Sequence, residues 1–425
     1  MYKTFRVLIG FAALCLAHTA QAQLISSTPY SRYGLGEINE NLGSIRNAGM
    51  AGTGISAANS YQPNLANPAL LYYNSITNFT MGIAGQAKQV SNEGNSQTNG
   101  NGNLNNVSLS VPVTKRWSSA VGLRPFSTVN YQVNVSDVVE GNPEATIFRE
   151  YVGSGGLSEA FFAHGVRITG GLTVGGSASY IFGNIANESS STISDPEQEG
   201  LGQERVTIVD RTSYSDFIFR AGANYRQKLA DKLFISAGGV YSFEAELDAE
   251  RMVTYERTTQ AASPADSAES SITIPASMRA GISIDNGSNL TVAADFASYQ
   301  WSKYRDFEGN NGGLEDSYRA ALGAEYTPEA NSIDSYFKRI TYRGGLYYSE
   351  TPYVLNGQRI TDKGVTAGAT LPIGRSTLYD LYQLNISVGY GQRGTTDYGL
   401  VKEDYLQFGL EFTVNSRWFI KRRIE

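Results

Sequence analysis

The chain has 425 residues, of which 17% are charged, and its formal net charge at pH 7 is −6. Its single cysteine, Cys15, lies near the N-terminus, which leaves no disulfide and no thiol ligand in the rest of the chain. Removal of residues 1–22, which carry Lys3 and Arg6, leaves 32 basic and 40 acidic residues, a balance that argues against nucleic acid as a partner.

Residues 1–22 have the three parts of a secretory signal peptide. Basic residues near the start are followed by an apolar run over residues 7–16 and by the small residues Ala20 and Ala22. The pattern predicts export and cleavage after Ala22. A membrane anchor would need a longer apolar run. A lipoprotein would use Cys15, but Leu14 is a poor residue to precede a lipidated cysteine.

Residues 23–75 are predicted to form a hatch, or plug, inside a larger structure. The stretch is polar, has glycine-rich turns at 33–36 and 49–54, and shows no sustained period of 2 or 3.6. Pro63 and Pro68 exclude a helix interior or a central strand between them. The alternative is a flexible tail, against which the leucines and alanines around Asn67 argue.

Residues 76–415 are predicted to form a transmembrane β-barrel, and residues 416–425 a basic C-terminal tail. The period of two is clearest at Leu406, Phe408 and Leu410, which share one face of a strand. In a bilayer such a face contacts lipid, whereas in water it would form a core. The fold class is all-β, a 14-stranded antiparallel barrel with the hatch in its lumen. Its strands are predicted to start at Ile76, Leu104, Ser118, Glu144, Leu172, Glu204, Lys232, Ser270, Asn289, Asp316, Tyr336, Gly357, Gln383 and Leu400.

The predicted connections alternate in length, as expected where long loops lie outside the cell and short turns lie in the periplasm. The long polar loops are residues 91–103, 189–203 and 261–269, and the tight links are residues 114–117, 230–231 and 286–288.

Several motifs resemble the FadL/TodX family of outer-membrane channels for long-chain fatty acids and other hydrophobic compounds. The hatch carries Tyr-Gly-Leu-Gly at 33–36 and Asn67-Pro68-Ala69 just before the first strand. Similar barrel segments are residues 289–307, 318–323 and 342–352, whereas the tail after Trp418-Phe419 departs from the pattern. The resemblance implies integral insertion in the outer membrane of a Gram-negative bacterium, a hydrophobic small-molecule ligand and no cofactor.

The resemblance also implies a sideways exit from the lumen at a kink in the third strand. Pro125 interrupts the third predicted strand and favours a kink or bulge there. Pro125, Phe126 and Ser127 are therefore the candidates for a lateral opening, and the alternative is an ordinary bulge near a strand end.

Four arginines fall at inward positions by the parity of their apolar neighbours, namely Arg220, Arg279, Arg319 and Arg343. One or more of them, with Arg32 of the hatch, is a candidate to bind a substrate carboxylate through charge-assisted hydrogen bonds. The alternative is that they pair with inward acids such as Asp295 and Glu325. If residues 286–288 form a three-residue turn, Arg279 lies opposite Asp295.

The sequence predicts no enzyme. His164, the only histidine after the signal segment, shares a strand face with Phe162, Val166 and Ile168, which is the face assigned to lipid. No partner residue for nucleophilic catalysis lies near it, and no zinc motif or phosphate-binding loop is present. The chain is therefore predicted to have no catalytic residue and no metal site.

The predicted function is passive uptake of hydrophobic compounds such as long-chain fatty acids, with movement of the hatch near Asn67, Pro68 and Ala69 opening the route to lateral release. One alternative is a structural or accessory barrel of a secretion system, whose long loops bind protein. Another is a polar porin, which an intact plug would prevent.

Overall fold

The computed structural model describes residues 28–194, 204–258, 260–375 and 381–416. The predicted signal peptide, the start of the predicted hatch, most of the 189–203 loop and nearly all of the basic tail lie outside the described residues. None of the helices in the described ranges is long and apolar enough to cross a membrane.

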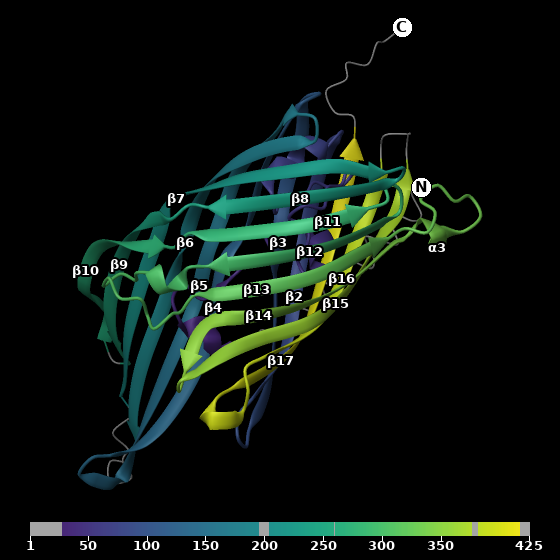
Figure 1. Cartoon of the computed structure of the whole chain (residues 1–425). Coiled ribbons are helices and arrows are strands. Elements are labelled where there is room, and N and C mark those ends of the chain that lie inside the picture. Colours follow the sequence, from purple (N-terminus) through teal and green to yellow (C-terminus); the bar gives the residue numbers. More distant parts are fainter. Residues whose placement is uncertain (1–27, 195–203, 259, 376–380, 417–425) are drawn as a thin grey trace.

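Fourteen antiparallel strands form a closed barrel, as predicted (Figure 1). Neighbouring strands pair in sequence order, except that β8 pairs with β11, and β17 pairs with β2 to close the ring. The strands are β2 (Thr77–Ser91), β3 (Ser96–Thr114), β4 (Trp117–Val139), β5 (Asn142–Thr169), β6 (Leu172–Ser194), β7 (Arg205–Ala230), β8 (Leu233–Ser242), β11 (Ser277–Asp285), β12 (Leu290–Tyr299), β13 (Ser317–Tyr326), β14 (Thr341–Leu355), β15 (Gln358–Arg375), β16 (Leu381–Arg393) and β17 (Lys402–Ser416).

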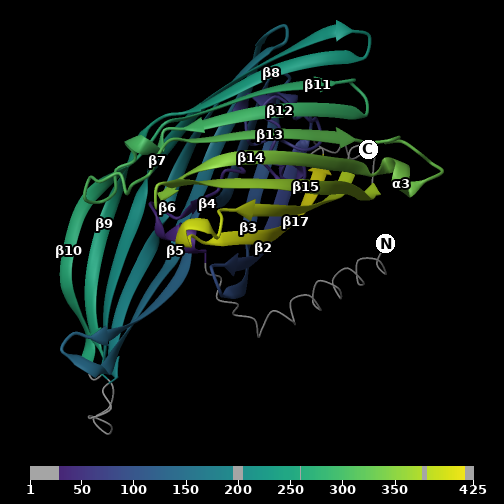
Figure 2. The same cartoon turned by 60° about the horizontal axis from the view of Figure 1, so that its bottom comes forward.

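Part of the sheet projects beyond the ring of strands (Figure 2). The hairpin of β9 (Ala245–Arg257) and β10 (Gln260–Ile274) extends this projecting part of the sheet. Strand β9 pairs with residues 206–215 of β7, and β10 pairs with β9. We call the end with the tight links, which lies toward the top right of Figure 1, the lower end, and the opposite end, toward the lower left, the upper end. The upper parts of β4 to β7, with β9 and β10, form the projecting sheet.

Several sequence predictions need correction here. Residues 96–103, 189–194 and 261–269 were expected in loops but belong to β3, β6 and β10, because β2, β5 and β9 pair with them along one edge. Residues 336–339, expected to open a strand, form the short helix α3 (Tyr336–Arg339). The last pair between β13 and β14 is Tyr326↔Tyr342, so β13 offers no partner to residues 336–339.

An apolar belt surrounds the barrel. On β17, Leu406, Phe408, Leu410 and Phe412 are 40–50% exposed, while the alternate residue Glu411 is buried. Phe162, Phe217 and Leu322 expose comparable fractions on other strands. A protein in water does not leave so much contiguous apolar surface uncovered, so the belt faces lipid and the strands span a membrane.

The described N-terminal residues 28–76 lie inside the ring and form the hatch (Figure 1). They include short elements only: η2 (Pro29–Arg32), β1 (Glu37–Ile38), α2 (Ile45–Ala48) and η3 (Pro68–Tyr73). Two further single turns, η5 (Trp301–Lys303) and η6 (Asp397–Gly399), lie in the upper connections. Near the upper end, Tyr30 and Leu35 of the hatch are 1% and 2% exposed in a core with Leu157 and Trp301. The protein's own side chains therefore fill this apolar part of the lumen.

Candidate functional site

At the lower end, Asn67 fixes the hatch to the wall. Its Oδ1 accepts a hydrogen bond from the Ala69 amide at 3.0 Å and so caps η3, whose first residue is Pro68. Its Nδ2 donates to the Ile55 carbonyl at 2.8 Å and to the Ala223 carbonyl of β7 at 3.2 Å. The wall is glycine-rich here, since a Cβ on Gly222 would lie 2.3 Å from Asn67 Oδ1. The Asn-Pro-Ala segment thus rests directly on the strands.

A buried triad joins the hatch to the lower ends of β13 and β14. Arg46 of α2 donates to both oxygens of Glu325, with Nη2 to Oε1 at 2.6 Å and Nε to Oε2 at 3.1 Å. Arg343 of β14 donates to Glu325 Oε2 at 3.0 Å. All three side chains are almost fully buried. We call Arg46, Glu325 and Arg343 the hatch triad.

Two more wall carboxylates bind the hatch through its backbone. Asp295 Oδ2 accepts from the amides of Gly54 and Ile55 at 2.7 and 3.0 Å. Glu411 Oε2 accepts from the amide of Ile45, at the start of α2, at 3.3 Å. Hydrogen bonds to a carboxylate are stronger than those to a neutral oxygen, so these contacts add to the attachment of the hatch.

A second buried triad lies within the wall. Glu159 of β5 accepts from Arg124 of β4 at 2.9 and 3.1 Å and also from Arg220 of β7. Arg124 also donates to the carbonyl of Leu42 in the hatch. We call Arg124, Glu159 and Arg220 the wall triad.

Near the upper end, Glu37 of the hatch lies between two wall cations. Lys88 of β2 donates to its carboxylate at 3.0 Å, and Arg393 of β16 also donates to it. Burial alone would raise the pKa of Glu37, but Lys88 and Arg393 lower it from its ordinary 4.5 to about 2. Glu37 is therefore charged at neutral pH.

The four predicted inward arginines all point into the barrel and all have partners. Arg220 and Arg343 belong to the two triads. Arg279 donates to the Glu40 carbonyl at 2.8 Å, and Arg319 contacts a Glu40 carboxylate oxygen at 3.4 Å.

Two details of the arginine prediction turn out differently. Arg279 lies opposite Ala297, not Asp295, because Asp285 pairs with Thr291 and the turn is longer than three residues. Arg32 does not join the other four, since its guanidinium contacts the neighbouring ring of Tyr33.

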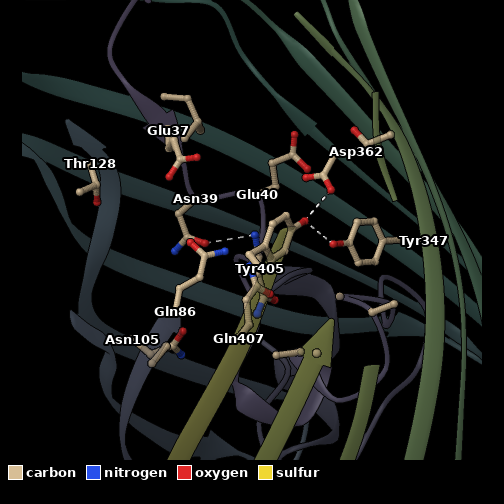
Figure 3. Close-up of a pocket in the computed structure, with 18 of the residues that line it drawn as sticks. Glu37, Asn39, Glu40, Gln86, Asn105, Thr128, Tyr347, Asp362, Tyr405 and Gln407 are labelled. Carbon is tan, nitrogen blue, oxygen red and sulfur yellow. Dashed lines mark hydrogen bonds between the residues drawn. The ribbon is translucent and has the colours of Figure 1, made fainter. Parts of the chain in front are cut away.

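A cavity of about 350 Å³ lies beside the hatch (Figure 3). Its lining combines carboxylates, amides and aromatic rings from the hatch, β2 to β4, β14, β15 and β17. On the cavity wall, the Tyr405 hydroxyl donates a hydrogen bond to the Asp362 carboxylate and also contacts the Tyr347 hydroxyl. Its two arginines, Arg319 and Arg393, are already paired with acids. Ligand pockets for apolar molecules are lined mainly by apolar side chains with a few polar groups, whereas this cavity mixes apolar and aromatic side chains with ion-paired acids and several amides.

The cavity reaches a seam in the barrel wall. The β3–β4 ladder ends at Val107↔Leu123, so above this pair the two strands separate. In its pairing with β5, β4 has a bulge between Pro125 and Ser127, the irregularity that Pro125 predicted.

The hatch covers the β4 side of this seam. Asn39 donates from Nδ2 to the Pro125 carbonyl at 3.1 Å and from its amide to the Phe126 carbonyl at 2.9 Å. Strand β1 then pairs with Ser127 and Thr128. Pro125, Phe126 and Ser127 thus lie at the seam but are tied to the hatch.

The sequence reading missed Glu37, Asn39, Glu40 and Arg46 as contacts of the hatch. The available signal was their position, since they are charged or amide residues in a stretch expected to lie inside a barrel with inward charges.

His164 lies on the outer face, as expected. Its ring is 4.3 Å from that of Phe162, and Trp117 donates to it at 3.1 Å. Across the described ranges, no cluster of three or more histidine, cysteine or acidic residues could hold a metal ion.

The barrel is similar to solved structures of a hydrocarbon channel, a toluene transporter and a FadL homologue. A CymD monoaromatic hydrocarbon channel is 16% identical, with 91% of this chain and 99% of that chain covered and a TM-score of 0.56. The P. putida toluene transporter TodX is 16% identical, with 88% and 98% covered and a TM-score of 0.55. A Pseudomonas aeruginosa FadL homologue is 12% identical, with 88% and 98% covered and a TM-score of 0.54.

These likenesses establish the FadL/TodX fold, and the proteins that share it here are channels rather than enzymes. No curated protein matches the chain. The sequence model of the BamG family matches residues 1–425, the full length. The chain therefore belongs to the BamG family.

Proposed function

We propose that this protein is an integral outer-membrane barrel, closed by its own hatch, that serves as a structural or accessory subunit and binds a protein partner through the projecting sheet. The projecting sheet is the observation that carries the proposal. About 9–11 residues suffice for a strand to cross a bilayer. Strand β5 has 28 residues, and β7 has 26. Most of that extra length lies beyond the lipid.

The projecting sheet exposes apolar side chains on both faces. Val138, Phe148 and Met252 lie on its outer face and are 62%, 51% and 52% exposed. Ile193 and Ile208 lie on the other face and are 51% and 44% exposed. Exposed apolar residues on a sheet outside the bilayer are typical of a surface that another protein covers.

The lumen supports the same proposal. The hatch is attached through Asn67, through the hatch triad and through Glu37, and the four inward arginines bind the protein's own acids or carbonyls. A transported carboxylate would have to displace one of these buried partners, which costs several kcal/mol unless it replaces the bond fully.

Co-purification of the tagged full-length protein from its native outer membrane in mild detergent tests this proposal. We expect a partner in fixed stoichiometry that is lost when Phe148→Asp and Met252→Asp are combined. The control exchanges Thr146→Asp and Thr254→Asp on the same strands, which adds equal charge without removing apolar contacts. A protein that purifies alone, or a partner retained by the apolar-to-Asp variant, would contradict the proposal.

A second candidate function is passive uptake of hydrophobic compounds such as long-chain fatty acids, with hatch-gated lateral release. The seam beside Pro125 favours it, and the named hydrocarbon channels share the fold. Uptake of oleate into proteoliposomes would distinguish the two functions. Saturable uptake that falls in a Pro125→Val variant would support the uptake function. Uptake equal to that of empty liposomes would exclude it.

A further inference from the structure

The β4 edge of the seam is covered by the hatch, whereas the β3 edge is not. From Pro125 to Thr128 the hatch satisfies β4, through Asn39 and β1. Above Thr128, the Thr28 amide donates to the Asn130 carbonyl at 2.8 Å, and the Asn130 amide donates to Ser31 at 3.1 Å. The hatch thus acts as the strand partner that β3 does not supply.

The facing edge of β3 has no such cover. Residues Gly100–Leu104 and Asn106 pair with β2 on one side, and a bulge in this ladder leaves Asn105 unpaired with β2. On the other side, no backbone partner is found for them within the described part of the chain. In an antiparallel strand alternate residues direct their N–H and C=O groups to opposite edges, so about half of these groups point into the seam.

This open edge lies at the height of the apolar belt. Gly102 is opposite Gly85 on β2, which in turn is opposite Phe408 on β17. Phe408 is half exposed in the belt. Open sheet edges are not stable at this depth in a bilayer unless protein or a water-filled cavity covers them.

We infer that the edge of β3 over Gly100–Asn106 is a strand-addition site for an extended segment of a partner membrane protein. Such a segment would form the ladder that β3 lacks, beside the hatch-covered edge of β4. The cavity of about 350 Å³ lies between these edges and gives it room. The inference is independent of the projecting sheet and survives if that surface binds nothing.

The side chains around the edge define the chemistry of the partner. The outward residues Gly100 and Gly102 lack side chains, so they leave space in the belt for apolar groups of an added strand. The inward residues Asn101, Asn103 and Asn105 line the cavity and offer amides. The site therefore fits a strand that alternates apolar residues toward lipid with polar residues toward the lumen, which is the pattern of a barrel strand.

The test measures amide hydrogen exchange of the full chain in lipid nanodiscs. The probe is a synthetic peptide with the sequence of residues 406–414, which has this alternation. We expect those amides of Gly100–Asn106 that point into the seam to exchange about ten-fold more slowly when the peptide is bound, and the amides that face β2 to change little. The same peptide with N-methyl groups on its binding edge should have no effect.

A pair of variants keeps the result specific. Asn103→Lys places a charge in the cavity and should abolish the protection, as edge lysines do elsewhere. Gln97→Lys, on the same strand above the proposed site, should retain it. Absence of protection by the peptide, or equal protection by oleate alone, would overturn the inference.

Discussion

The hatch triad and the wall triad have the same composition but join different parts of the molecule. Each places one buried glutamate between two arginines. In the hatch triad Arg46 comes from the plug, whereas in the wall triad both arginines come from strands. The first therefore fixes the hatch in the lumen, and the second fixes β4, β5 and β7 next to the seam. Similar buried charges can thus have separate mechanical roles.

Glu325→Gln should have the largest effect on closure. It leaves the guanidinium groups of Arg46 and Arg343 buried without a carboxylate, and loss of one partner from a buried pair costs about 3–5 kcal/mol. We expect a lower melting temperature, faster proteolysis of the hatch and intermittent ion conductance. Glu329→Gln, which removes an exposed pair with Lys338, is the matched control and should change little.

Glu159→Gln tests whether the wall triad has a different role from the hatch triad. We expect a comparable loss of stability, about 3–5 kcal/mol, because Arg124 and Arg220 lose their shared carboxylate. Hydrogen exchange should rise in β4 to β7, while the barrel stays closed to ions. Conductance as large as that of Glu325→Gln would show that the triads are not distinct in role.

Asn67→Ala should have a smaller effect at the lower end of the hatch. It removes the cap of η3 and the bonds to Ile55 and Ala223, and loss of a cap costs about 0.5–2 kcal/mol. The expected result is a modest fall in melting temperature with faster amide exchange at residues 69–73 only. Faster exchange throughout residues 45–57 would mean that Asn67 holds the whole hatch.

Acidification should weaken the ion pairs of Glu37 with Lys88 and Arg393 only at low pH. Because the pKa of Glu37 is lowered to about 2 from 4.5, its pairs stabilise the folded state fully above about pH 4.5 and are lost as the pH falls toward 2. The stability difference between the native chain and Glu37→Gln should therefore shrink across that window. A difference that is constant down to about pH 2 would contradict the assignment.

The sequence predicted the features that depend on local alternation. The fourteen strands, the inward arginines and the outward Phe162 and His164 follow from the period of two. The β9–β10 hairpin was missed because residues 261–271 are polar and lie outside the bilayer, where no apolar face is required. The partners of the hatch were missed because a contact such as Arg46–Glu325 joins residues 279 positions apart, and no local pattern encodes that pairing.

Single-channel recording of the purified full-length protein in planar bilayers tests the central claim most directly. A lumen closed by its own hatch predicts no steady conductance for the native chain and intermittent openings for Glu325→Gln. Steady conductance of the native protein would contradict the account.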